Sequence, residues 1–371
     1  MDVVVTGIGL MSCLGSLQTT HSNILQGHSG IEPHQLFTQL AAYPLALIDA
    51  RPSKIDYLTQ KILVDTLQDA KLIAPLTECG VVIGSSRGCQ AQWETLTKQK
   101  NLSIDNWLET LPDRPAIITA NYLKTTAPVL APMAACATGI WALARGYELI
   151  KSDRCQRVIV GAVEAPISPL TLAAFERMGA LAKTGCYPFD LAREGLVLGE
   201  GGAIFVLETA ELATRRQAKV YGKIRGFGLT CDAYHISTPQ TLGSSAALAV
   251  KQSLERSKLK PEDIDYIHAH GTSTTLNDRH EAQLIQHIFP QKVAVSSTKG
   301  ATGHTLGASG AIGTALTLMA MNDNCLSPCV GLKNPEFELD VLMQPRKAKV
   351  DRAMCFSFGF GGQNAVVTLS K

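Results

Sequence analysis

The sequence predicts an α/β protein with mostly parallel, buried sheets. Strand-like apolar runs alternate with helical patterns along the chain, as expected where helices cross over between parallel strands. Apolar residues make up 46% of the chain and charged residues only 18%, a composition that suits strands buried on both faces. The 31 glycines provide for tight turns and close backbone contacts.

The first predicted strand covers residues 3–5 and runs into a glycine turn at Gly7 and Gly9. This opening resembles that of a dinucleotide-binding fold. The third glycine is missing, however, and no acidic residue follows at the expected distance after a second strand. A nucleotide site is therefore not expected here.

The alternation then continues in order, without a long polar linker, so we expect one large unit or two closely packed halves. The first half is predicted to hold helices over 57–70 and from Cys136 to about Ile150, and strands over 80–84, 158–164, 203–207 and 220–228. The second half is predicted to hold helices over 245–257 and 307–321, and strands over 266–269, 293–297 and, as a pair, within 354–369.

Composition excludes several classes of protein. The formal charge is +2, and Lys and Arg form no stripe that would indicate nucleic-acid binding. The N-terminal residues do not resemble a secretory leader, and no window reaches the roughly 18 apolar residues of a spanning helix, so we expect a soluble, cytoplasmic protein. The ten cysteines lack the spacing of a disulfide framework or a zinc site, and most are expected to be small buried apolar residues.

Cys136 is a candidate nucleophile because it lies between an extended apolar stretch and a predicted helix. A thiol at a helix N-terminus has its thiolate favoured by the macrodipole and by free backbone N–H groups. The small residues around it, from Ala134 to Gly139, leave room for a substrate carbonyl. A buried structural cysteine also fits the local sequence.

His270 follows a predicted strand that opens into a glycine turn. If the strand continued, His268 and His270 would point to the same face, which admits a metal site completed by Asp278, His280 or His304. None of these further ligands has a telling spacing, so no metal is expected; a satisfied polar core residue is the simpler interpretation of one histidine.

His304 is surrounded by small residues just before an Ala- and Gly-rich helix, where the backbone can approach a ligand closely. Lys299, five residues earlier, could supply positive charge, although a solvated surface lysine fits equally well. Near the C-terminus, Phe358 and Phe360 alternate with glycines in residues 357–364. Such a turn can aim a backbone N–H into a site while a ring swings over it, and a structural hairpin would explain the glycines too.

Together, a thiol, two histidines, a lysine and a glycine-flanked aromatic form a coherent set for thioester chemistry. The thiol would form an acyl-enzyme, and neutral imidazoles would stabilise an enolate oxygen. At this point the chain resembles the β-ketoacyl-acyl-carrier-protein synthases of thiolase fold, of the elongating type that uses one cysteine and two histidines. The resemblance lies in segments that fall in family order along almost the whole chain: residues 4–9, 134–139, 188–201, 232–235, 268–274, 296–310 and 357–364.

The resemblance implies two similar α/β halves, residues 1–235 and 236–371, stacked in a five-layered α-β-α-β-α arrangement, and a homodimer. It implies no cofactor, because acyl and malonyl groups arrive on the phosphopantetheine of an acyl carrier protein. The resemblance also implies the catalytic roles: Cys136 is acylated, His270 and His304 bind the malonyl carbonyl, and the amides of Cys136 and Phe360 form the oxyanion hole. Lys299 and Glu281 would form a supporting charged pair. Thr272 and Thr274 would contact the phosphopantetheine arm, and Phe358 and Phe360 would belong to a gating turn.

The chain also departs from the family, being shorter than typical members and poorly matched over residues 35–50 and 84–133. Two alternatives stay open. One is an acyltransferase on the same fold that loads Cys136 without condensation, and the retained histidine pair speaks against it. The other is a chain-length partner subunit of another synthase, which Cys136 disfavours because such subunits generally lack the cysteine.

Overall fold

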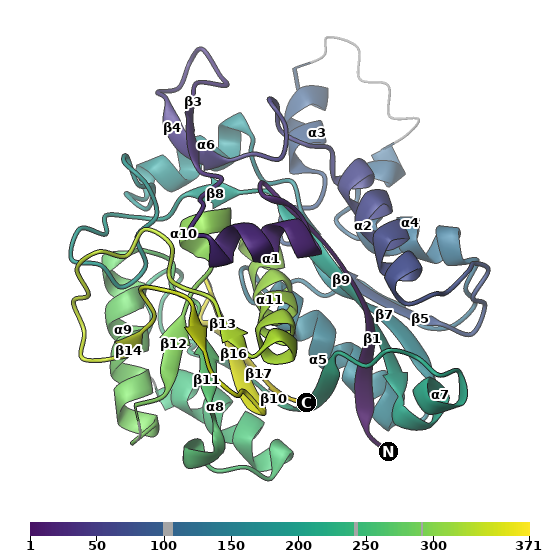
Figure 1. Cartoon of the computed structure of the whole chain (residues 1–371). Helices are drawn as coiled ribbons and strands as arrows, with labels where there is room; N and C mark the ends of the chain where they lie inside the picture. Colours follow the sequence, from purple (N-terminus) through teal and green to yellow (C-terminus); the bar gives the residue numbers. More distant parts are fainter. Residues whose placement is uncertain (99–106, 241–243, 291) are drawn as a thin grey trace.

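The main sheet is continuous and consists of two halves with the same strand order, called here the first and the second sheet, with a pair of helices between them (Figure 1). The structure is a computed structural model that describes residues 1–98, 107–240, 244–290 and 292–371. The first sheet contains, in spatial order, β6 (Val129–Leu130), β5 (Gly80–Gly84), β7 (Arg157–Glu164), β9 (Gly201–Thr209) and β1 (Val3–Ser12). The second contains β12 (Ala294–Ser296), β11 (Tyr266–His268), β16 (Arg352–Gly359), β17 (Gln363–Ser370) and β10 (Gly222–Cys231), with β14 (Asp340–Val341) beyond β12.

Each sheet is mixed, which corrects the prediction of mostly parallel strands. In the first sheet β5 pairs in parallel with β6 and β7, whereas β9 runs antiparallel to β7 and β1. The second sheet repeats this pattern, because β17 returns as a hairpin from β16 and runs antiparallel to β10. The two sheets join where β1 and β10 pair over three residues. The predicted α/β class is nevertheless confirmed.

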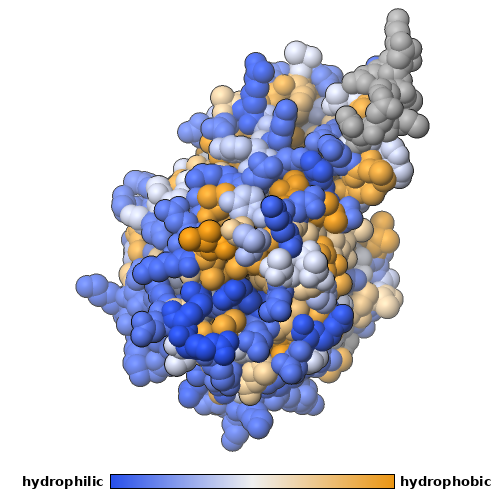
Figure 2. Space-filling model, turned by 90° about the vertical axis from the view of Figure 1, so that its right-hand side faces the viewer, coloured by the Kyte–Doolittle hydropathy of each residue, from blue (hydrophilic) through white to orange (hydrophobic). Residues whose placement is uncertain are grey.

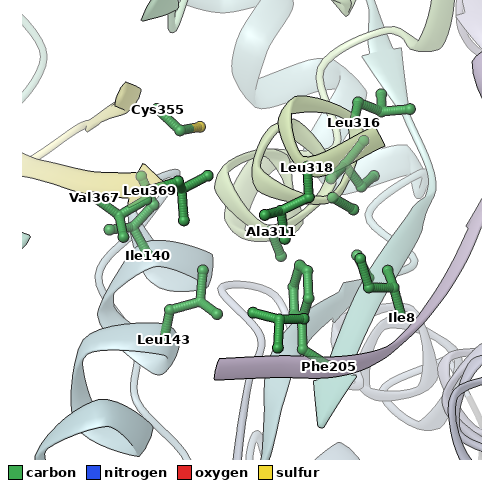
Figure 3. Close-up of a cluster of buried hydrophobic side chains, with 14 of the residues drawn as sticks. Ile8, Ile140, Leu143, Phe205, Ala311, Leu316, Leu318, Cys355, Val367 and Leu369 are labelled. Carbon is green, nitrogen blue, oxygen red and sulfur yellow. The ribbon is translucent and has the colours of Figure 1, made fainter. Parts of the chain in front are cut away.

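Helices occupy three layers, so the chain forms five layers in all. The helices α5 (Thr138–Lys151) and α11 (Ser309–Asp323) lie between the sheets, α2 (Ile55–Asp69) and α4 (Arg114–Leu123) pack on the outer face of the first sheet, and α8 (Ser244–Ser257) and α9 (Thr275–Ile288) pack on that of the second. Because α11 meets apolar neighbours on all sides, its apolar residues surround the helix instead of forming one stripe. Figure 3 shows this central core, in which α5 and α11 meet side chains of β1, β9 and β17.

Gly7 and Gly9 lie inside β1 and not in a turn, which corrects the predicted end of the first strand at residue 5. The strand passes so close to α2 that a Cβ at Gly7 would stand 2.5 Å from the Cβ of Ala70. A Cβ at Gly9 would stand 2.8 Å from the backbone N of Thr66. The glycines therefore serve helix-on-sheet packing, and the loop expected at this point does not exist.

Shorter elements connect the layers. Those not predicted from the sequence include α1 (Leu17–Leu25), β2 (Gly15–Ser16), β3 (Glu32–His34), β4 (Tyr43–Ala46), α3 (Gln90–Leu96), α6 (Pro169–Arg177), β8 (Leu198–Gly199), α7 (Ala210–Arg215), α10 (Lys299–Thr302), β13 (Cys325–Leu326), β15 (Arg346–Lys347), and 3-10 turns at Trp107–Thr110, Pro261–Asp263 and Leu306–Ala308. The division of the halves at residue 235 stays a prediction; β10, which ends at Cys231, pairs with β17 of the second sheet. In the described part of the chain, no helix is long and apolar enough to cross a bilayer.

Candidate active site

Cys136 lies directly before α5, at the inner end of the helix between the sheets. The chain enters this position through Ala135, whose φ of 46° is left-handed, and the Ala134 N–H donates to the Thr138 hydroxyl at 2.9 Å. Small residues follow because α5 crosses α11 closely: a Cβ at Gly139 would stand 2.5 Å from the backbone N of Ala311. Helix packing thus explains part of the small-residue run that we assigned to substrate access.

The turn between β16 and β17 holds the backbone of Cys136 from the second half. The Ser357 hydroxyl donates to the Cys136 carbonyl at 2.9 Å. A Cβ at Gly359 would stand 3.0 Å from the Cys136 N, a tight contact that glycine avoids as the turn approaches the nucleophile. The backbone of the next residue, Phe360, acts to lower the pKa of the Cys136 thiol, as a nearby hydrogen-bond donor does. Residues 357–364 are therefore both a hairpin and part of the site.

The Cys136 thiol is neutral at rest. Burial raises its pKa to about 11, although Lys299, Arg87 and the hydrogen bond from the Phe360 backbone act in the opposite direction. The buried thiols of Cys186, Cys329 and Cys355 have a pKa of about 12 for the same main reason. The expected preference for thiolate is thus outweighed by desolvation, and the thiol must lose its proton during the reaction.

His270 lies just beyond β11, which ends at His268, so side-chain alternation does not extend to it. Gly271 turns the chain with a φ of 41°. The Glu281 carboxylate accepts the N–H groups of His270 and Gly271 at 2.6 and 2.7 Å. The Lys299 ammonium donates to the His270 carbonyl and lies 3.5 Å from its Nδ1. An ammonium has only donors, so Nδ1 accepts and the Nε2 of His270 carries the proton.

His304 reaches the same point from the chain before α11. Its backbone N–H donates to the Val197 carbonyl at 2.6 Å, and its Nδ1 lies 2.8 Å from the Ser309 hydroxyl. The rings of His270 and His304 are 5.3 Å apart and nearly perpendicular, at 82°. Burial, and then the charge of Lys299, lowers the pKa of both imidazoles well below the ordinary value, so both are neutral at pH 7.

Lys299 and Glu281 lie behind the histidines. Among the described residues they form no ion pair within 4.0 Å, although the charge of each affects the pKa of the other. The charged pair implied by the family resemblance is therefore a longer-range electrostatic interaction, with both side chains bonded to the backbone around His270. Burial raises the pKa of Glu281 to about 7, opposed by the hydrogen bonds from the Gly271 and His270 amides. Burial likewise lowers the pKa of Lys299. Both residues position His270, and neither lines the cavity described next.

One cavity of about 280 Å³ brings the remaining candidates together. The hydroxyls of Thr272 and Thr274 lie 2.9 Å apart, and the Phe358 ring is 5.9 Å from that of His270. The sequence candidates that line the cavity are Cys136, His270, Thr272, Thr274, His304, Phe358 and Phe360. A nucleophile, two neutral imidazole donors and two hydroxyls therefore share one space.

Sequence reasoning missed several residues around this cavity. Phe175 of α6 stacks on Phe360 with ring centres 6.1 Å apart, and Ser309 orients His304. Glu164, at the end of β7, is fully buried behind Cys136. The sequence could have indicated Glu164, because a carboxylate at the end of an otherwise apolar strand is unusual. His268, in contrast, lies away from the cavity beside Thr298, and no cluster of three His, Cys, Asp or Glu suited to a metal occurs in the described ranges.

Two family models match the chain: that of the β-ketoacyl synthase N-terminal domain over residues 52–213 and that of the C-terminal domain over 221–333. The chain belongs to the β-ketoacyl synthase family. It is 32% identical over 408 residues to the 3-oxoacyl-(acyl-carrier-protein) synthase 2 of Staphylococcus aureus, covering 100% of this chain and 98% of that protein. A Synechocystis protein of the same name is 33% identical, with the same coverage. These alignments are longer than the 371 residues of this chain, which agrees with the expected trimming.

Solved structures confirm the ketosynthase fold of thiolase type. A β-ketoacyl synthase from Burkholderia phymatum has a TM-score of 0.90 and 25% identity, covering 100% of this chain and 99% of that one. A type II polyketide synthase acyl-carrier protein in complex with its ketosynthase gives a TM-score of 0.94 at the same identity and coverage. A ketosynthase/chain length factor for ishigamide scores 0.92, also at 25% identity and the same coverage. Synthases of both fatty-acid and polyketide type are thus similar to this chain.

Proposed function

We propose that this β-ketoacyl synthase catalyses the decarboxylative condensation of an acyl thioester with a malonyl thioester on an acyl carrier protein. The observation that carries the proposal is the pair of neutral imidazoles, 5.3 Å apart, in the same cavity as Cys136. Simple acyl transfer has less need for two such donors. Two imidazole N–H groups that face the same cavity are suited to stabilising a developing enolate oxygen.

The first half-reaction loads the enzyme. The Cys136 sulfur attacks the acyl thioester carbonyl, the carrier leaves as its thiol with the proton of Cys136, and the acyl group stays bonded to sulfur. The backbone N–H groups of Cys136 and Phe360 would stabilise the oxyanion, in keeping with the effect of the Phe360 backbone on the pKa of the Cys136 thiol. The hydroxyls of Thr272 and Thr274 would contact the phosphopantetheine arm of each carrier.

The second half-reaction makes the carbon–carbon bond. The malonyl C–C bond breaks, carbon dioxide leaves, and the electron pair of that bond forms an enolate. The enolate oxygen would accept hydrogen bonds from the Nε2 of His270 and from that of His304, whose Nδ1 would accept the Ser309 hydroxyl. The enolate carbon attacks the acyl-Cys136 carbonyl. The Cys136 sulfur then leaves and takes up a proton from water, and the 3-ketoacyl product departs on the carrier.

The test supplies purified protein with a series of acyl carriers and malonyl carrier, measures carbon dioxide release, and weighs the products by mass spectrometry. Condensation predicts carbon dioxide and a 3-ketoacyl carrier two carbons longer than its acyl donor. An acyltransferase would release no carbon dioxide. A chain-length partner would show no activity until a second synthase was added, an outcome made relevant by the chain length factor among the similar structures.

We further propose that the protein acts in the cytoplasm as a homodimer. Cytosolic conditions keep a thiol such as that of Cys136 reduced. On the face shown in Figure 2, apolar side chains form patches between hydrophilic ones. The edge strand β6 exposes Leu130, Met133 follows it, and α4 exposes Tyr122. An apolar sheet edge is suited to pairing with a second copy, and sedimentation of the wild type against Leu130→Lys tests this.

A further inference from the structure

A second cavity also borders Cys136. It measures about 360 Å³ and shares Cys136, Phe175 and Phe360 with the first cavity. Neither His270 nor His304 is among the described residues that line it. A malonyl group needs the imidazoles, so this cavity is the one available to the acyl group on Cys136. The inference therefore rests on the proposed function.

The wall of this cavity carries an arginine on a rigid turn. Arg87 follows β5, and the buried carboxylate of Glu164 accepts the Ser86 N–H, the Arg87 N–H at 3.3 Å and the Ser85 hydroxyl at 3.0 Å. Gly88 then adopts a left-handed φ of 53° and donates its N–H to the Ser85 hydroxyl at 2.8 Å. The backbone at Arg87 is thus held from both sides.

The Arg87 guanidinium has few partners of its own. Its Cζ lies 5.6 Å from the centre of the Phe175 ring, and among the described residues its guanidinium hydrogen-bonds only to the Gln90 side chain, at a long 3.4 Å. Within the described part of the chain, no carboxylate lies within 4.0 Å of this group. Its charge acts on Cys136, whose pKa it lowers. A guanidinium has five N–H donors, so most remain available to a ligand.

We propose that Arg87 makes this cavity select acyl groups that carry an acceptor oxygen, ionised or neutral, away from the thioester. A saturated alkyl chain would displace water from the guanidinium and offer no hydrogen bond in return. A carboxylate or ketone oxygen on the acyl chain would accept the free N–H groups, and the Phe175 ring would pack against the intervening carbons. Arg87 is a specificity-determining residue in this arrangement.

The experiment measures acylation of Cys136 by intact-protein mass spectrometry. Three short thioesters of equal length serve as donors: hexanoyl, 5-oxohexanoyl and adipoyl. We expect wild type to load adipoyl about tenfold faster than hexanoyl, the factor of one charged hydrogen bond, with 5-oxohexanoyl between them. Arg87→Met should bring the three rates together, and Arg87→Lys should retain the preference for adipoyl. Arg177→Met, on the exposed surface of α6, is the control for loss of one positive charge.

The outcomes separate the inference from the proposed function. Equal loading of all three donors by wild type overturns the inference alone, as does an adipoyl preference that Arg87→Met retains. Loading of none of these donors, while others of the acyl-carrier series load, also overturns the inference alone. Loading of no donor of either set overturns both, because Cys136 would then accept no acyl group.

Discussion

Each half of the chain contains a turn that is held by a buried glutamate and that lines a cavity beside Cys136. The strands β5 and β11 occupy equivalent positions in their sheets, and each is followed by a turn whose successive N–H groups bind a buried glutamate. In the first half Glu164, at the end of β7, holds the turn that carries Arg87. In the second half Glu281 of α9 holds the turn that carries His270. One scaffold thus presents a cation to one cavity and an imidazole to the other.

The two halves of the chain contribute different catalytic groups to the site. The first half contributes the nucleophile and the arginine, whereas the second contributes both imidazoles and the turn that covers Cys136. The halves meet where α5 crosses α11, so the nucleophile and the imidazoles come together only at their interface. Variants in one half should therefore affect one half-reaction more than the other.

The largest effect is expected for Cys136→Ala. Condensation should become undetectable by mass spectrometry of the carrier products, because no acyl-enzyme forms. The imidazoles remain in place, so the variant should still release carbon dioxide from malonyl carrier. Full condensation activity in the variant would refute the assignment of the nucleophile.

A smaller but still large effect is expected for His270→Ala and His304→Ala. Each removes one donor to the enolate oxygen, which should lower carbon dioxide release by about 10²–10³-fold. Acylation of Cys136, followed by intact mass, should fall by less than about tenfold. Equal losses in both half-reactions would contradict the division between the halves.

Glu281→Gln tests the carboxylate that holds the His270 turn through the pH dependence of stability. The pKa of Glu281 is raised from 4.5 to about 7 in the folded chain, so folding favours its protonated form. This contribution to stability is complete below about pH 4.5 and is lost as pH rises through 7, a change of about 3 kcal/mol. The free energy of unfolding of wild type relative to Glu281→Gln, measured by denaturant titration, should fall over this range.

The equivalent carboxylate supplies the matched comparison. Burial raises the pKa of Glu164 too, against the hydrogen bonds from Ser86, Ser85 and Arg87. Glu164→Gln should therefore show a pH dependence of the same sign, while leaving the decarboxylation rate less affected than Glu281→Gln does. A difference in stability that does not vary with pH would contradict the raised pKa of either group.

Much of this arrangement could be predicted from the sequence, and what could not depends on distant contacts. Buried strands such as β5 and β7 and the apolar helices α5 and α11 have local patterns strong enough to predict. Gly7 and Gly9 were misread as a turn because their partner, α2, lies some 60 residues along the chain. Whether neighbouring strands run parallel or antiparallel depends on which strands pair, and local sequence patterns do not predict that pairing.

The site shows the same limit. The residues Cys136, His270 and His304 were predicted as a set, and the structure places them around one cavity. The resting state of the thiol was wrongly expected to favour the anion, because burial cannot be judged from the residues beside it. Glu164 and Arg87 were not predicted, because their roles depend on contacts between separate elements: Glu164 binds the Arg87 backbone, and the Arg87 guanidinium lies over the Phe175 ring.

The smallest effect is expected for the paired hydroxyls of Thr272 and Thr274, which we propose contact the phosphopantetheine arm. Thr272 and Thr274 lie 2.9 Å apart and line the same cavity as the imidazoles, yet neither contacts the Cys136 sulfur. Thr274→Val removes one hydrogen bond and leaves the shape, so the KM for both carriers should rise about three- to tenfold with kcat little changed. Steady-state kinetics with each carrier varied in turn provide the measurement. Because both half-reactions use the phosphopantetheine arm, an effect on only one carrier would show that these hydroxyls serve one half-reaction and do not contact the arm in both.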